Sequence, residues 1–226
     1  MIMDIHSHTW YSNCGQDDPR VIIDAAIAGG IELFGISDHN YGIGDRKKEY
    51  FELLSALREE YRGKIQLVRG IELCTIRNLW LADDEDISFF DYCLVENIDN
   101  EESSVGLGIF DYARRCGCLT GIAHTDLIGF ARRLGEDPAV FLRRFAENNI
   151  FWEMNVNYDS IHRYHEHAYV KRLCESAEEQ EFVRSSGIRL SVGFDGHRVG
   201  DYRPERVRSM CAFLMEKGLP MISFEQ

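Results

Sequence analysis

The stretch Asp4-Ile-His-Ser-His8 closes a short apolar run with two histidines. Side chains two residues apart on a strand point to the same face, so His6 and His8 are placed to bind one metal ion through both imidazoles. Further residues of metal-binding type end later apolar runs in the same way: His39, Glu72, His124, Asp195 and His197. We therefore expect these side chains to meet at one rim of an α/β fold.

Seven strand-like runs alternate with amphipathic segments along the chain. The predicted strands, rich in aliphatic and aromatic residues as buried parallel strands are, cover residues 3–6, 33–37, 65–72, 91–95, 119–123, 151–155 and 189–194. The predicted helices cover residues 19–28, 46–61, 103–115, 137–148, 165–185 and 204–217. Repeated alternation of strand and helix indicates either a doubly wound sheet or an α/β barrel.

The positions of the metal-binding residues favour the barrel. Each of them lies at the carboxyl end of a predicted strand, and in a parallel barrel those ends deliver their side chains to one open rim. A doubly wound sheet would instead spread them along a line. The chain has 226 residues, 45% of them hydrophobic, with no break in composition, so we expect a single domain over residues 1–226.

Composition excludes several classes of protein. No apolar stretch approaches the roughly 18 residues that a membrane span needs, and the amino terminus lacks the basic and apolar regions of a secretory signal. The seven cysteines form an odd set without CxxC spacing, which predicts reduced thiols in a cytoplasmic protein. The formal net charge of −13 disfavours binding to long nucleic acid. An anionic substrate would therefore need a locally positive pocket.

Each motif taken alone has a simpler structural interpretation. Asp38, before His39, either orients an imidazole or closes a polar turn. Glu72 either binds a metal ion or pairs with an arginine, since a buried carboxylate needs a cation. His124 alone would be a buried core histidine. It is the repetition at strand ends that favours a metal site.

Five motifs in order, HxH at residues 6–8, SDHN at 37–40, GIE at 70–72, AHTD at 123–126 and FDGH at 194–197, resemble the polymerase and histidinol phosphatase superfamily, known as PHP. The resemblance extends over nearly the whole chain. It implies a distorted (β/α)7 barrel with up to three divalent metal ions at the C-terminal rim of the strands. It also implies a phosphoesterase activity.

The resemblance also implies which residues share each ion. It assigns His6, His8, Glu72 and Asp195 to a first ion, Glu72 and His124 to a second, and His39 and His197 to a third. The chain departs from the family pattern at two ligand positions. Shortly after the first histidine pair, Cys14 or Asn13 stands where a histidine is usual, and after the fourth strand Glu96, Asn97, Asp99 or a water takes that place. More oxygen ligands favour Mn or Fe(II) over Zn.

Two to three divalent ions (Zn, Mn or Fe) would activate a water as hydroxide and polarise a phosphoryl group. Glu72 would then serve as a bridging ligand, while Asp195, His197 or a water protonates the leaving alcohol. The candidate phosphate-binding residues are Arg198, Arg132 and Arg133. Alternatively, each of these arginines is an ordinary solvated surface residue. The histidines at positions 162, 165 and 167 line a pocket or, as we favour, form an exposed helix entry.

These observations predict a phosphomonoesterase acting on a small phosphorylated metabolite, such as histidinol phosphate or a nucleotide. One alternative is metal-assisted hydrolysis of an amide or lactone, because amidohydrolase barrels also begin with HxH. Those barrels usually have eight strands and a bridging lysine, and no lysine ends a predicted strand here. The other alternative is a non-catalytic metal-binding regulatory domain, suggested by the two altered ligand positions.

Overall fold

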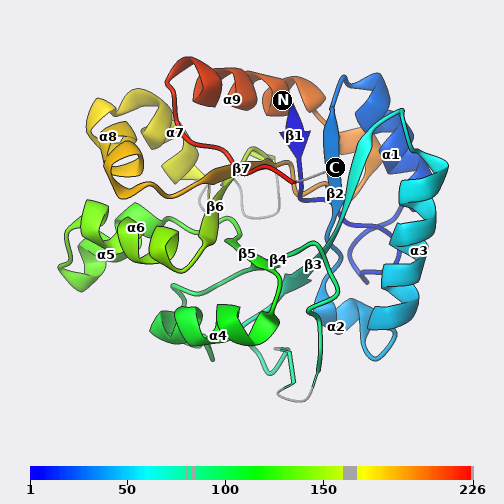
Figure 1. Ribbon diagram of the computed structural model, residues 1–226, viewed down its shortest axis with the longest axis horizontal. Coiled ribbons are helices and arrows are strands. Elements are labelled where there is room, and N and C mark those ends of the chain that lie inside the picture. Colours follow the sequence, from blue (N-terminus) through cyan, green and yellow to red (C-terminus); the bar gives the residue numbers. More distant parts are fainter. Residues whose placement is uncertain (80, 83–84, 160–166, 225–226) are drawn as a thin grey trace.

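Seven parallel strands form the centre of the protein in a computed structural model that describes residues 1–79, 81–82, 85–159 and 167–224. The strand order β1-β2-β3-β4-β5-β6-β7 follows the chain. The strands are β1 (Met3–Asp4), β2 (Leu33–Ile36), β3 (Gln66–Leu73), β4 (Tyr92–Val95), β5 (Leu119–Ile122), β6 (Ile150–Asn155) and β7 (Leu190–Gly193). Helices surround these strands (Figure 1).

The first and last strands meet and nearly close the sheet into a barrel. The Ile5 amide donates to Val192 O at 3.0 Å, and the Asp195 amide donates to His6 O at 2.7 Å. A parallel bridge also joins Ser7 to Gly196. The predicted (β/α)7 barrel is thus confirmed, and the ends of β1 and β7, with their candidate ligands, lie next to each other.

The helices begin largely where the sequence predicts. They are α1 (Pro19–Ala28), α2 (Asn40–Ile43), α3 (Lys47–Glu60), α4 (Ile109–Cys116), α5 (Leu127–Leu134), α6 (Pro138–Glu147), α7 (Ala168–Glu175), α8 (Ala177–Ser186) and α9 (Pro204–Glu216), with short 3-10 helices η1 (Gly106–Gly108) and η2 (Val199–Asp201). In α1 and α6, an aspartate caps the amino end and a proline follows in the first turn. None of the helices within the described residues is long and apolar enough to cross a membrane.

The long helix predicted over residues 165–185 is wrong. Residues 165 and 166 lie outside the described residues, and the remainder is divided at Ser176, whose backbone is extended (φ −105°, ψ 107°). The Ser176 hydroxyl accepts a hydrogen bond from the Glu179 amide at 3.2 Å. A serine in this role starts a new helix, so α7 ends and α8 begins at the same residue.

Two further helix predictions need correction. The segment 103–115 becomes α-helical only at Ile109, after the 3-10 helix η1, because the Ser103 hydroxyl accepts from the Gly106 amide at 3.1 Å and Gly106 has φ +48°, which makes a turn. Helix α5 was not predicted. The sequence signals for it are Asp126, whose carboxylate accepts from the Gly129 amide at 2.8 Å, and the terminating Gly135 with φ +72°.

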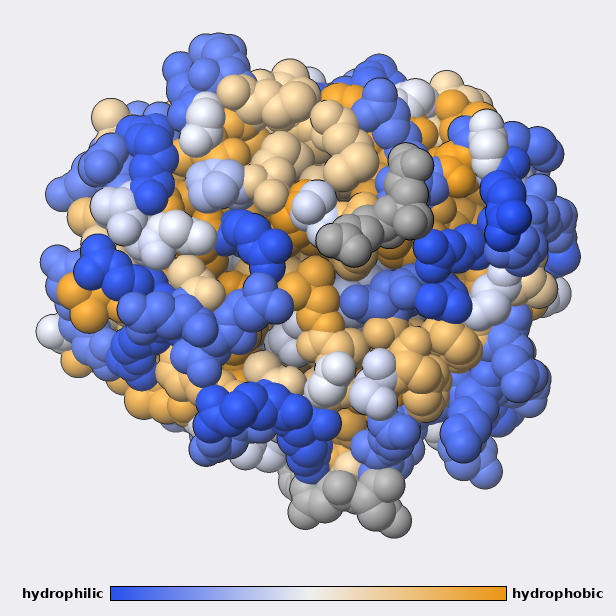
Figure 2. Space-filling view, in the orientation of Figure 1, coloured by the Kyte–Doolittle hydropathy of each residue, from blue (hydrophilic) through white to orange (hydrophobic). Residues whose placement is uncertain are grey.

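Tyr92 of β4 crosses the barrel interior beneath the open rim. Its hydroxyl donates to Ile5 O at 2.5 Å, and its ring fills the space that Cβ atoms at Gly35 and Gly70 would occupy. On the outer surface, hydrophilic residues dominate the periphery of the face in Figure 2 and hydrophobic residues gather nearer its middle. Because the barrel interior is filled by side chains such as Tyr92, we expect the functional site to lie at the ends of the strands.

Candidate metal centre

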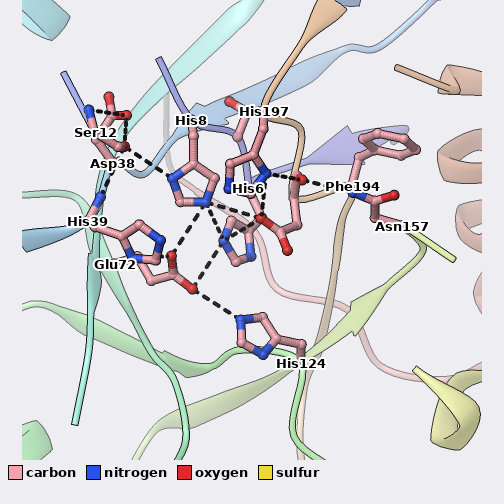
Figure 3. A network of polar contacts seen from close by, with 12 residues as sticks. His6, His8, Ser12, Asp38, His39, Glu72, His124, Asn157, Phe194 and His197 are labelled. Atoms are coloured by element: carbon pink, nitrogen blue, oxygen red, sulfur yellow. Dashed lines mark hydrogen bonds and ion pairs between the residues drawn. The ribbon is translucent and has the colours of Figure 1, made fainter. Parts of the chain in front are cut away.

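The predicted ligands converge at the carboxyl ends of the strands, where their side chains point toward one another (Figure 3). Among the described residues, three groups each bring their candidate ligand atoms within 4.8 Å of one another: His6, His8 and Asp195; His8, Cys14, His39 and His197; and His39, Glu72 and Glu96. The groups share His8 and His39. They therefore form one continuous cluster instead of three separate sites.

The candidate ligands that follow β1, belong to β3 and follow β7 form the most buried part of the cluster. His6 Nε2 lies 3.2 Å from His8 Nε2 and 3.2 Å from Glu72 Oε1. His8 Nε2 lies 3.1 Å from Asp195 Oδ1. The two imidazoles have fully buried side chains, and the Glu72 side chain is 1% exposed. These nitrogen and oxygen atoms face a common point, as ligands of a shared cation do.

Sequence reasoning missed Glu153, a fully buried carboxylate on β6. His6 Nδ1 lies 2.7 Å from Glu153 Oε1, and Glu153 Oε2 accepts from the His124 amide at 2.9 Å. The first contact fixes the ring so that Nε2 faces the cluster, which is how carboxylates orient metal-binding histidines. A Cβ at Gly193 would overlap Glu153 Oε1. The available signal was a glutamate inside an apolar strand.

His8 is oriented by a second buried carboxylate. Its Nδ1 lies 3.2 Å from the Ser12 hydroxyl, which in turn hydrogen-bonds to Asp38. Asp38 also accepts from the Thr9 amide at 2.6 Å and the Thr9 hydroxyl at 2.7 Å. Asp38 therefore acts through Ser12 on His8 and at the same time closes the turn after β1.

The backbone at Asp195 is held in a left-handed conformation with φ +56°. The Asn157 side-chain amide donates to Asp195 O at 3.0 Å, and the Asp195 amide donates to His6 O. A non-glycine residue in this region needs such external support. These contacts place the Asp195 carboxylate beside both histidines of the first motif.

At the first altered position, the structure brings Cys14 into the cluster and leaves Asn13 exposed. Burial opposes ionisation of the thiol, but contacts with His197 and His39 lower the pKa of Cys14 to about 7. A thiol that ionises near neutral pH is suited to metal binding, because the thiolate is the ligand.

At the second altered position, Glu96 lies in the cluster. Its Oε1 is 3.8 Å from His39 Nδ1, and its Oε2 is 3.8 Å from His124 Nε2. Asp99 instead pairs with Arg133 at 2.6 Å. Of the alternatives raised by the sequence, Glu96 is the one whose carboxylate reaches both histidines.

Charge is concentrated in this cluster. Burial opposes the ionisation of Glu72, yet the charges of His39 and His6 hold its pKa well below the ordinary value. Burial opposes protonation of His124, but its hydrogen bond and charge interaction with Glu72 raise its pKa to about 10. His8 behaves oppositely, since burial, together with repulsion from His39 and His197, lowers its pKa to about 3. Protons bound by His124 and other imidazoles thus partly balance the negative charge of the carboxylates.

The residues present fit divalent metal ions. His39 Nδ1 and Glu72 Oε2 are buried and face each other at 2.9 Å. Neither atom makes a hydrogen bond of regular geometry with the described residues. Buried polar atoms are rarely left in this state without a ligand. Imidazole nitrogens, carboxylate oxygens and a thiol are also the donors that Zn, Mn and Fe(II) accept.

The three arginines proposed to bind phosphate have different surroundings. Arg132 pairs with Glu179 at 2.8 Å, and Arg133 pairs with Asp99. Arg198 is exposed next to His197 and lines a small cavity that also touches α1 and β2. The structure therefore does not bring them together around the cluster. Their phosphate-binding role stays a prediction.

The histidine-rich segment differs from the exposed helix entry that we favoured. His167 is fully buried, and its ring lies edge-on to that of His124 with 6.4 Å between ring centroids. The exposed interpretation is therefore wrong for His167. His162 and His165 lie outside the described residues.

A family model described as the PHP domain matches residues 4–198. The chain belongs to the PHP family. Among solved structures, it is similar to histidinol phosphate phosphatase (HISK) from Lactococcus lactis subsp. lactis Il1403, solved with zinc, L-histidinol and phosphate. That likeness has 16% identity and a TM-score of 0.69, and covers 99% of this chain and 96% of that one.

The fold is also similar to that of one chain in the structure of an archaeal ribonuclease P with mature tRNA, at 12% identity with a TM-score of 0.53 and 99% coverage of both chains. No curated protein matches the chain. At these identities the two structural likenesses show the fold alone. The family assignment itself comes from the match over residues 4–198.

Proposed function

We propose that this PHP-family protein is a metal-dependent phosphoesterase that hydrolyses a small phosphorylated metabolite, such as histidinol phosphate or a nucleotide. The observation that carries the proposal is the buried cluster of imidazoles, carboxylates and one thiol at the open rim of the barrel. The family and the likeness to a histidinol phosphate phosphatase support the same reaction class.

The cluster offers donors for three ions. We assign His6, His8, Glu72 and Asp195 to the first, Glu72, Glu96 and His124 to the second, and Cys14, His39 and His197 to the third. When bound, such ions lower the pKa of a coordinated water and polarise phosphoryl oxygens. The assignment agrees with the contacts of Glu72, which lies within 3.5 Å of imidazole nitrogens of all four of its histidine neighbours.

The protein residues supply orientation and protons. Glu153 holds His6 and the Ser12 hydroxyl holds His8, so both rings keep Nε2 toward the substrate side of the cluster. Asp195 Oδ1 and His197 Nδ1 lie 3.6 Å apart at the more open side, where the His197 side chain is 36% exposed. We propose that one of these two groups, or a water, returns a proton to the departing alcohol.

A small substrate agrees with the charge of the protein. The formal net charge of −13 would repel a long nucleic acid, whereas metal ions suffice to attract one phosphate group.

The seven cysteines are all free thiols in the structure, which supports our proposal of a cytoplasmic location.

The test is a panel of phosphorylated metabolites, including histidinol phosphate and nucleotides, assayed with Mn, Zn and Fe(II). We expect hydrolysis of at least one, competitive inhibition by millimolar phosphate, and loss of activity in His8→Ala. Asp111→Ala is the matched control, because the Asp111 side chain is 86% exposed on α4. Wild-type turnover by His8→Ala would refute the site assignment.

The same assays separate the two alternatives. Hydrolysis of a lactone or amide with indifference to phosphate would favour carbonyl chemistry. Fewer than two bound ions together with no hydrolysis of any substrate would favour a non-catalytic metal-binding domain.

A further inference from the structure

The two altered ligand positions lie at different corners of the cluster and bring in opposite chemistry. Cys14 contributes sulfur, and Glu96 contributes oxygen. We call the set His8, Cys14, His39 and His197 the sulfur corner, and the set His39, Glu72, Glu96 and His124 the oxygen corner. The difference between these corners decides which metal each one prefers.

The sulfur corner contains four donors, three imidazoles and one thiol, with ligand atoms within 4.8 Å of one another. The His8 ring stacks on both neighbouring imidazoles, with centroids 4.6 Å from His39 and 4.4 Å from His197. Four tetrahedral ligands of zinc would have donor atoms roughly 3.3–3.7 Å apart, given Zn–N and Zn–S bonds of about 2.0–2.3 Å. Because His8 is assigned to the first ion, small shifts of Cys14, His39 and His197 would supply three of these ligands and leave the fourth position to water or substrate.

A second observation points to a ligand here. His39 Nδ1 is buried and has no hydrogen-bond partner among the residues described. The His39 residue is only 9% exposed, and the atom is directed into the cluster, 2.9 Å from Glu72. His39 thus presents this buried nitrogen at the junction of the two corners, within 2.9 Å of a carboxylate oxygen of Glu72.

The oxygen corner is built from two carboxylates. The side chains of Glu72 and Glu96 are 1% and 12% exposed, and both approach His39 and His124. Two neighbouring buried carboxylates repel each other unless a cation lies between them. Oxygen-rich sites favour harder metals such as Mn and Fe(II), whereas thiolates favour zinc.

We propose that the centre is heterometallic, with zinc at the sulfur corner and Mn or Fe(II) at the oxygen corner. This inference rests on the proposed metal-dependent function and goes beyond it by assigning metals to corners. It also refines the expectation, drawn from the sequence, that more oxygen ligands favour Mn or Fe(II) over Zn.

The test is metal competition on the full chain. Chelator-stripped protein is dialysed against equal concentrations of Zn and Mn under a reducing buffer, and the bound metals are counted by mass spectrometry. We expect both metals in the wild type, selective loss of zinc in Cys14→Ser, and selective loss of manganese in Glu96→Gln. Cys174→Ser is the control, since Cys174 is a partly buried free thiol on α7.

A spectroscopic measurement tests whether Cys14 is a metal ligand, independently of enzymatic activity. Protein loaded with Co(II) should show a sulfur-to-cobalt charge-transfer band in the near ultraviolet that disappears in Cys14→Ser and persists in Cys174→Ser. Thermal unfolding of each variant establishes that it is folded. The result that overturns the proposal is zinc retention and an unchanged spectrum in folded Cys14→Ser, or the same metal ratio in all variants.

Failure of this inference differs from failure of the proposed function. Selective metal loss without hydrolysis of any phosphoester would refute the function and leave the metal assignment standing. Phosphatase activity with one metal throughout the cluster would do the reverse.

Discussion

The candidate metal ligands carried by strands differ from those carried by loops. His6 and Glu72 come from the ends of β1 and β3, are almost fully buried, and contact several partners each. Cys14 and His197 come from the segments after β1 and β7 and are partly exposed. The barrel thus orients the first pair before any ion arrives. We expect the second pair to be organised mainly by the ion itself.

The largest expected difference is between removing a strand ligand and removing a loop ligand. Activity of His6→Ala should fall by about a thousandfold or more, since several kcal/mol of metal-derived stabilisation are lost. His197→Ala should lose roughly tenfold to a hundredfold, equivalent to about 1.4–2.7 kcal/mol. Steady-state hydrolysis of an aryl phosphate measures both. Equal losses of activity in the two variants would contradict the distinction between strand and loop ligands.

Glu153 tests whether preorganisation matters for the strand ligands. Glu153→Gln keeps the shape but removes the negative charge facing His6 Nδ1, so metal affinity should fall by about 10–100-fold, as for other carboxylates behind metal-binding histidines. The measurement is a competitive metal titration with a chromogenic chelator. Glu178→Gln on α8 serves as control, because the Glu178 side chain is 70% exposed. An unchanged affinity would mean that Glu153 only fills space.

Gly193 tests the same contact through packing. A Cβ there would overlap Glu153 Oε1 and lie 2.6 Å from the His6 Cβ. Gly193→Ala should therefore lower the free energy of unfolding by about 1–3 kcal/mol, the usual cost of overpacking a core. Gly200→Ala is the control, because nothing lies within 4 Å of its added Cβ. Urea denaturation compares them, and equal stabilities would contradict the close approach.

The smallest predicted effect is on the pH dependence of stability. Burial opposes protonation of His197, but its contacts with Cys14 and Asp195 raise its pKa to about 9, and that of His124 is about 10. A histidine whose pKa is raised by folding stabilises the fold at pH values below its unfolded pKa of 6.5. This stabilisation is lost as the pH rises through the pKa of the folded state. The melting temperature of metal-free protein should thus fall between pH 6.5 and 10.

Metal should remove this dependence, because a bound ion replaces the protons that balance the carboxylates. Zinc-loaded protein is the comparison, measured by thermal unfolding in matched buffers. A metal-free melting temperature that rises over the same pH interval would contradict the assigned charges.

The sequence predicted the strands and the convergence of the candidate ligands for one physical reason. Each parallel strand is a continuous apolar run, and the polar residue that ends it, such as Glu72, lies at the rim of the barrel. Glu153 was missed because its strand is buried on both faces, so its inward position gives no periodic signal. The break at Ser176 was missed because one capping hydrogen bond, invisible to periodicity, divides α7 from α8.

The central claim is tested most directly by returning metal to stripped protein. Chelator-treated protein should not hydrolyse an aryl phosphate, and stepwise addition of Mn or Zn should restore hydrolysis as the cluster fills, with at least two ions bound per active chain. Full activity in the stripped protein would contradict the account. So would complete inactivity, across the phosphorylated panel, of folded protein that has bound two or more ions.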